Sequence, residues 1–79
     1  MVQDLRLPSI DGLRAFEASA RLGSFERAAE ELDLGASAIA KRIATVEELL
    51  GTALFARGTK PLQLTPSGRE YLPQVKGAL

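Results

Sequence analysis

Two helical patterns separated by a short turn constrain the fold of this chain more than any other feature. From Phe25 onward, apolar residues recur at i+3, i+4 and i+7, which is the spacing of one face of an α-helix. A second pattern places an apolar residue at every third or fourth position from Ile39 to Leu50. Residues 33–35, Asp-Leu-Gly, form the turn between them. The chain is therefore predicted to pack two short helices directly against each other.

Length and composition exclude several classes of function. With 79 residues the chain supports one small domain, and a domain of this size buries only about 60% of its unfolded surface, which leaves little room for a catalytic cavity. The chain contains neither cysteine nor histidine, which excludes a disulfide, a thiolate metal site and the usual near-neutral acid–base residue. We therefore expect no enzymatic activity, no metal and no cofactor.

No segment of the sequence is suited to a membrane. The apolar stretches are far shorter than the roughly 20 residues that span a bilayer. The first residues also lack the basic start and apolar run of a signal peptide. The expected location is the cytoplasm.

Charge is unevenly distributed along the chain, although the net charge is zero. Residues 1–33 hold four cations and seven acids, a balance of −3, whereas residues 34–69 hold five cations and two acids, a balance of +3. One end of the molecule is therefore predicted to be positive and the other negative. The positive part contains the second helical pattern.

Start and stop signals frame the first two helices. Ser9 is placed to cap a first helix whose apolar stripe includes Leu13 and Phe16. Gly23 stands where a left-handed stop residue is needed, and Ser24 caps the second helix. The core is expected to include Phe16, Phe25, Ile39, Ile43 and Phe55.

The third helix, predicted from about Gly35 to Leu50, has two contrasting faces. Its larger apolar residues fall within an arc of about 60°; they are Ile39, Ile43, Val46 and Leu50. The opposite side carries Ser37, Lys41, Ala44, Thr45 and Glu48, with Arg42 on the flank. The outward face is therefore small, polar and basic near its start, and only Lys41 projects far. The pair Glu47 and Glu48 is interpreted as a solvated helix end.

A β-hairpin and a last helix are predicted to follow. Residues 54–57 and 62–64 are expected to be short strands, because a turn-forming Gly-Thr-Lys-Pro sequence separates them. This hairpin carries cations at its tip. Thr65 and Pro66 then open a helix in which Pro73 is expected to cause a kink or loosen a turn.

The order helix, helix, helix, hairpin is that of a winged helix-turn-helix. The predicted fold is mainly α, with a three-helix core, a small β-hairpin wing and the start of a C-terminal helix. This shape suits duplex DNA, because the major groove admits one α-helix. Small residues on the outward face of the third helix would let its axis approach the base edges, and the basic hairpin could hold the backbone beside it.

The chain from about Leu7 to Leu79 resembles the N-terminal DNA-binding domain of LysR-type transcriptional regulators. The resemblance rests on the order and spacing of short pieces: Gly23-Ser24-Phe25 with Arg27-Ala28-Ala29, Ile43 and Glu47 with Leu50-Gly51, Leu54-Phe55 with Arg57, and Leu64-Thr65 with Gly68. It implies a bacterial regulator that binds a pseudo-palindromic promoter site in double-stranded DNA as a homodimer or tetramer.

The resemblance also implies a domain organisation. Residues 1–65 would form the winged helix-turn-helix domain, and residues 66–79 the start of a linker helix that serves dimerisation. The family's C-terminal domain, through which a small-molecule effector would act, is absent from this chain, which is expected to be a fragment. The apolar residues expected at a dimer interface are Leu72, Val75 and Leu79. Simple packing on the first helix is the alternative for them.

The residues predicted to contact DNA come from three elements. Lys41 is expected to be the main groove residue, while Arg27, Arg57 and Lys60 would contact phosphates. The other expected groove contacts are Ala36, Ser37, Ala40 and Thr45. Each cation has a structural alternative, such as an ion pair of Arg27 with Glu30 or Glu31. Both kinds of role also remain open for Arg42 and Arg69.

Four positions depart from the family pattern. Gly35 and Ala36 stand where the family has Ser or Thr followed by Gln, Ala40 stands where it often has Ser, and Glu26 stands where it has Thr. The family's polar side chains typically contact bases and phosphates, so those contacts do not transfer to this chain. An alternative function is therefore a winged-helix protein-interaction module without DNA binding, which the zero net charge and the acidic first part of the chain also favour.

Overall fold

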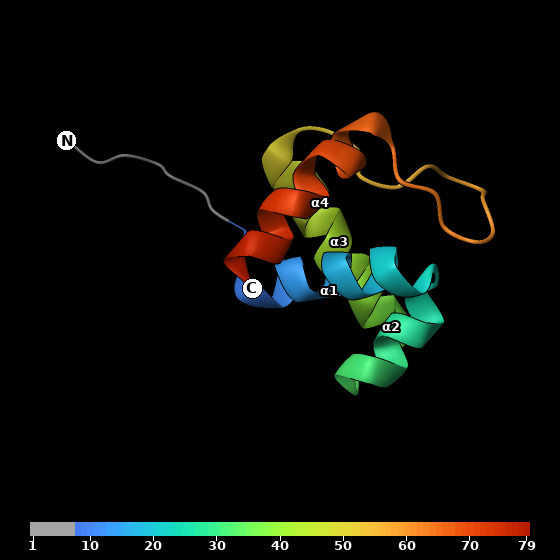
Figure 1. Cartoon of the computed structure of the whole chain (residues 1–79). Helices are drawn as coiled ribbons and strands as arrows, with labels where there is room; N and C mark the ends of the chain where they lie inside the picture. Colours follow the sequence, from blue (N-terminus) through green and yellow to red (C-terminus); the bar gives the residue numbers. More distant parts are fainter. Residues whose placement is uncertain (1–7) are drawn as a thin grey trace.

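The computed structural model describes residues 8–79, and the part of the predicted domain before Pro8 lies outside the described residues. Four helices follow one another: α1 (Ile10–Leu22), α2 (Phe25–Leu32), α3 (Ala36–Leu50) and α4 (Pro66–Ala78). Helix α1 lies at the centre and packs against each of the other three (Figure 1). The predicted mainly α architecture, with a three-helix core, is confirmed.

The predicted helix signals act as expected. The hydroxyl oxygens of Ser9, Ser24 and Thr65 each accept the backbone N–H three residues ahead, at 3.0, 3.2 and 3.0 Å. Gly23 and Gly51 both adopt the left-handed conformation with φ of 72°, and they end α1 and α3. These local rules fix where α1, α2 and α4 begin and where α1 and α3 end.

The core forms where α1 crosses α3 and α4. An aromatic cluster links α1 to α4 and to the segment after α3, with ring centroids 5.5 Å apart for Phe16 and Phe55 and 5.7 Å apart for Phe16 and Tyr71. Phe25 adds an edge-on contact with Phe55 at 5.8 Å. Such pairs contribute stability beyond the apolar area that they bury. The buried hydrophobic residues are Leu13, Ala15, Phe16, Ala18, Ala28, Ala29, Ile39, Ile43, Val46, Leu54, Phe55 and Val75.

Two glycines permit close approach of neighbouring elements. A Cβ atom on Gly12 would lie 2.8 Å from the Val46 side chain, so α1 and α3 touch at this point. A Cβ atom on Gly68 would overlap the backbone carbonyl oxygen of Leu54. The start of α4 therefore rests directly on the backbone that leaves α3.

The wing is not a β-hairpin, which corrects the prediction for residues 54–57 and 62–64. The only pairing in the described chain is an isolated antiparallel bridge between Phe55 and Leu64. It does not extend toward the tip: the Ala56 N–H bonds to the Gln63 carbonyl at 2.8 Å, but the Gln63 N–H bonds to the Thr59 hydroxyl at 3.2 Å instead of to the Ala56 carbonyl. Leu62 donates its N–H to the carbonyl of Gly23 at 3.0 Å, which ties the wing to the end of α1. The Thr59 hydroxyl bridges the two sides of the wing where further strand hydrogen bonds would lie, because it donates to the Ala56 carbonyl and accepts the N–H of Gln63. The wing is thus a loop that projects from the bundle (Figure 1).

Helix α4 passes through Pro73 without a break. Pro73 is exposed, and the helix is a single segment of 13 residues. The proline therefore does not end the helix, and the expected kink or loosened turn stays a prediction. No helix of the described chain is long and apolar enough to cross a membrane.

Candidate nucleic-acid interface

Helix α3 presents the two faces that its sequence predicts. Ile39, Ile43 and Val46 are 0, 2 and 1% exposed and anchor the helix to α1 and α2. The exposed residues of α3 include all five that were expected on the other side: Ser37, Lys41, Ala44, Thr45 and Glu48. Ala36 and Ala40 are partly buried at the edge of this face. We call this surface the α3 face.

The α3 face carries few side chains that can form directed polar contacts. Lys41 is exposed and forms no ion pair within residues 8–79. The Thr45 hydroxyl donates to the Lys41 carbonyl at 3.0 Å, which leaves its oxygen available only as an acceptor. Gly35 supplies no side-chain cap at the start of the helix. Among the residues of this face, Lys41 is therefore the longest side chain and the one cation.

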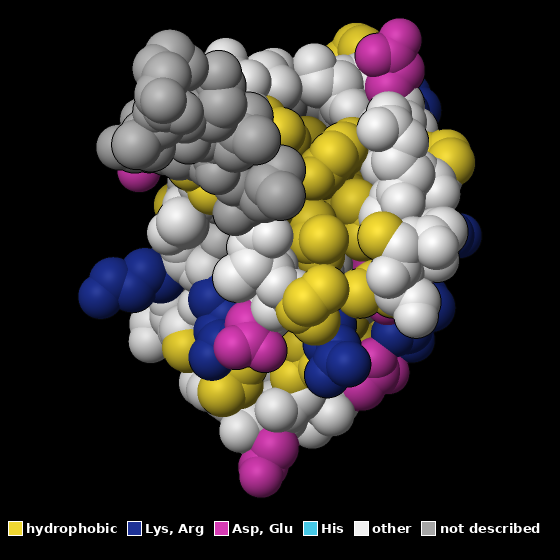
Figure 2. Space-filling view, turned by 90° about the vertical axis from the view of Figure 1, so that its left-hand side faces the viewer, with side chains coloured by type: hydrophobic (Ala, Val, Ile, Leu, Met, Phe, Trp, Pro, Cys, Tyr) yellow, Lys and Arg dark blue, Asp and Glu magenta, His cyan; other side chains and the backbone are white. Residues whose placement is uncertain are grey.

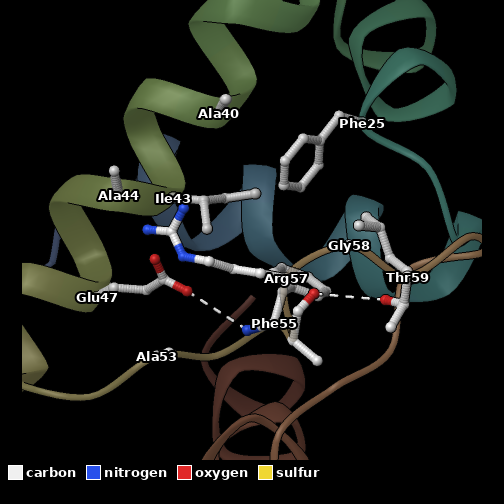
Figure 3. Close-up of a pocket in the computed structure, with 12 residues that line it drawn as sticks. Phe25, Ala40, Ile43, Ala44, Glu47, Ala53, Phe55, Arg57, Gly58 and Thr59 are labelled. Atoms are coloured by element: carbon white, nitrogen blue, oxygen red, sulfur yellow. Dashed lines mark hydrogen bonds between the residues drawn. The ribbon is translucent and has the colours of Figure 1, made fainter.

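A groove of about 400 Å³ separates the α3 face from the wing. Phe25, Ile43 and Phe55 form its apolar floor, and Ala40 and Ala44 form its α3 side. Figure 3 shows Arg57 running back from the wing, so that its guanidinium group ends beside α3 near Ile43 and Ala44. Arg57 was expected on the hairpin, and the structure brings it next to the α3 face.

Glu47 fixes the root of the wing, and sequence reasoning missed this role. Its Oε2 atom accepts the N–H of Leu54 at 2.7 Å and that of Phe55 at 3.4 Å (Figure 3 shows the second bond). The interpretation of Glu47 as a solvated helix end is therefore wrong, whereas its neighbour Glu48 is exposed as expected. In the sequence, Glu47 lies on the flank of the buried stripe and is one of the residues that carry the LysR resemblance, but neither feature predicts this contact.

The start of α2 lies beside the tip of the wing. A hollow of about 420 Å³ is lined by Ser24 and Glu26 from this end of α2 and by Thr59 and Lys60 from the wing. Arg27 is exposed one residue further along, and within residues 8–79 it forms no ion pair with Glu30 or Glu31. The candidate cations thus come from two elements, Arg27 from α2 and Arg57 and Lys60 from the wing, and Arg57 lines the groove beside the α3 face.

Other cations have structural partners. Arg42 pairs with Asp11 at 3.3 Å and ties α3 to α1. Arg69 donates to the Leu64 carbonyl at 3.3 Å. These contacts favour the structural alternative for both residues.

A third cation links the first two helices. Arg21 bridges Glu31 of α2 and Glu17 of α1, and these two carboxylates raise the pKa of its guanidinium group above the ordinary value. Glu31 is therefore paired with Arg21 and not with Arg27, whose side chain is exposed to solvent.

The comparisons with known proteins agree with this geometry. Residues 10–69 match the family described as bacterial regulatory helix-turn-helix protein, lysR family. The chain belongs to the LysR family. Residues 10–69 form the helix-turn-helix domain of this family of bacterial regulatory proteins.

Characterised LysR-type relatives support the assignment. The chain is 46% identical, over 94% of its length, to the carbapenem-hydrolyzing beta-lactamase transcriptional activator of Enterobacter cloacae. It is 44% identical, over 90% of its length, to the glycine cleavage system transcriptional activator of Escherichia coli K12. The chain spans about a quarter of the length of these relatives, 25% and 23% respectively.

Solved structures show the same domain with DNA. The BenM DNA-binding domain in complex with benA site 1 DNA has a TM-score of 0.86 at 30% identity, with 89% of this chain and 79% of that one covered. Vibrio fischeri DarR in complex with DNA has a TM-score of 0.88 at 28% identity, with 94% and 25% covered. The winged helix-turn-helix assignment therefore holds, although the wing of this chain is a loop.

The residues expected at a LysR-type dimer interface differ in exposure. Val75 is 2% exposed and belongs to the core, which favours packing within the domain for this residue. Leu72 is partly buried against the same core, whereas Leu79 is 49% exposed. Figure 2 shows hydrophobic side chains gathered in a band on the side of the molecule that carries α4. Leu79 is thus the predicted interface residue that is most accessible to a second copy.

Proposed function

We propose that this LysR-type domain reads promoter DNA by placing the α3 face in the major groove. The observation that carries the proposal is the contrast between the two sides of α3. Buried Ile39 and Ile43 hold the helix from behind, while small residues and Lys41 face outward. A helix with so little bulk on its outer side can approach base edges closely, and the major groove has the width to admit it.

The proposed contacts divide into base reading and positioning. Lys41 would contact a guanine edge, and Ser37 and Thr45 would supply shorter polar contacts. Ala36 and Ala40 would contact thymine methyl groups. Arg27, Arg57 and Lys60 would contact phosphates and set the register without reading sequence.

We further propose that two copies bind together. Paired helix-turn-helix domains read half-sites about 34–36 Å apart, which gives a pseudo-palindromic site. Leu79, with Leu72 beside it, is the proposed contact between copies along α4. A tetramer would extend the same arrangement, and a small-molecule effector would act through residues outside this chain. The proposed site of action is the cytoplasm, where bacterial promoters lie, and the proposed role includes no catalysis.

Selection of bound sequences from a random duplex pool tests the proposal. The chain would be fused to an unrelated dimerising domain, so that pairing does not depend on α4. Enrichment of two half-sites one helical turn apart is the expected result, and Lys41→Ala should abolish or relax the enrichment. A fusion that enriches no sequence and retains no duplex at low salt would favour the protein-interaction alternative.

A further inference from the structure

Glu26 occupies an unusual place for an acidic residue in a DNA-binding surface. It is the second residue of α2, and its Oε1 atom accepts the Ser24 hydroxyl hydrogen at 3.0 Å. The same Ser24 oxygen accepts the N–H of Arg27, so the carboxylate, the hydroxyl and the first turn of α2 form one connected group. Glu26 is exposed, so this group faces solvent.

The carboxylate lies among the cations that are proposed to contact phosphates. Glu26 and Lys60 line the same hollow, and Arg27 follows Glu26 in the chain. Phe25, on the other side of Glu26, lines the groove beside Ala40 and Ala44 of the α3 face. A duplex seated on the α3 face would therefore bring its sugar-phosphate backbone toward the start of α2.

The amino end of a helix favours an anion. Its first N–H groups lack helical partners, and the helix dipole places partial positive charge there. Many proteins use this position to hold a phosphate. In this chain the carboxylate of Glu26 is already present, and its own backbone N–H, the Ser24 hydroxyl and nearby Lys60 lower the pKa of Glu26, so it is ionised at neutral pH.

We propose that Glu26 takes the anion position at the amino end of α2 and withholds a DNA phosphate contact there, so that it lowers the affinity of the domain for every duplex. This inference rests on the proposed function, since it needs the α3 face in the major groove. It concerns the strength of binding and not the sequence that is read, because Glu26 stands outside the α3 face.

The substitution Glu26→Gln tests this role, since it removes the charge and keeps the shape. Its affinity for a mixed-sequence duplex and for the selected site would be measured by fluorescence anisotropy over a salt series. Both should rise about two- to fivefold at low salt, which is the range expected for one exposed charge contact. The gain should shrink as salt increases, and the salt dependence of log K should steepen by up to about 0.9.

Two variants serve as controls. Glu26→Asp keeps the charge and should bind like the unmodified chain. Glu70→Gln removes a charge from an exposed position on α4 and should leave affinity and salt dependence unchanged. Thermal melting of each variant would show that all are equally folded.

Three results would overturn the proposal. Equal affinity of Glu26→Gln and the unmodified chain would show that no contact is withheld. An equal gain in Glu70→Gln would reduce the effect to total charge, and a gain confined to the selected site would place Glu26 in base reading. Failure of the unmodified chain to bind any duplex is a distinct result, because it would remove the proposed function itself and this role with it.

Discussion

Glu47 of α3 accepts the backbone N–H of Leu54 at 2.7 Å, so the helix that carries the α3 face also fixes the start of the wing. The two residues are seven positions apart and are separated by the left-handed turn at Gly51. A single carboxylate thus sets the distance between two parts of the proposed DNA surface. Arg57 follows shortly after this anchor, so its position depends on the same contact.

Substitution of Glu47 by alanine should destabilise the domain. The N–H of Leu54 would lose its partner in a partly buried place, which costs about 1–3 kcal/mol in the free energy of unfolding. Glu48→Ala is the matched control, because Glu48 is adjacent and exposed, and its loss should change stability by less than about 0.5 kcal/mol. Urea unfolding followed by circular dichroism measures both. Equal effects of the two substitutions would show that the Glu47 contact adds nothing to stability.

Two glycines of α4 should respond to alanine in opposite directions. Gly68→Ala places a methyl group against the Leu54 carbonyl, so it should destabilise the chain by about 2 kcal/mol or more. Gly77→Ala meets nothing within 4 Å and should stabilise the helix by about 0.5–1 kcal/mol. Thermal unfolding of both variants tests the contrast. A stable Gly68→Ala variant would mean that α4 does not rest on the backbone after α3.

The sequence predicts the parts of this fold that depend on neighbouring residues. Helix caps, glycine stops and the two faces of α3 follow from spacing within one element, so Ser24, Gly51 and Lys41 lie where the pattern places them. The wing depends instead on a contact between distant segments. The N–H of Leu62 bonds to the carbonyl of Gly23, 39 positions earlier, and no local pattern could show this tie between the wing and the end of α1.

The candidate site is predictable to the same degree. Periodicity alone predicts that Lys41 and Ser37 are exposed on α3, because exposure on a helix is a local property. Arg57 lies beside α3, and Glu47 bonds to the backbone of Leu54, only because the wing folds against α3. Composition and spacing do not reveal this packing. Val75 is similar, since its burial depends on the packing of α4 against α1.

Adjacent residues Lys41 and Arg42 should separate DNA binding from stability. Lys41→Ala should weaken binding to the selected site by about 1–3 kcal/mol, if the lysine contacts a guanine, and leave unfolding unchanged. Arg42→Ala removes the ion pair between Arg42 and Asp11. The side chains of Arg42 and Asp11 are 35 and 69% exposed, so the loss of this pair should cost at most about 1 kcal/mol of stability. Anisotropy titration and urea unfolding of both variants give the two readouts. A larger loss of affinity in Arg42→Ala than in Lys41→Ala would reverse the assignment.

The link between α1 and α2 should make stability depend on pH in the acid range. Arg21 lowers the pKa of Glu31 below its ordinary value of 4.5, so the folded state holds the ionised form more strongly than the unfolded chain. The resulting stability is fully present above pH 4.5 and is lost as the pH falls through the lowered pKa. Glu31→Gln should therefore be less stable than the unmodified chain at pH 6, and the difference should vanish in strong acid.

Glu30→Gln is the matched control for this pH dependence. Glu30 is the exposed neighbour of Glu31 on α2 and forms no ion pair within residues 8–79. Urea unfolding from pH 6 down to pH 2 would compare the three proteins. Glu30→Gln should keep the acid-range loss of stability that Arg21 and Glu31 produce, whereas Glu31→Gln should flatten it. A pH profile that is the same for both variants would show that the bridge between Arg21 and Glu31 does not stabilise the packing of α1 on α2.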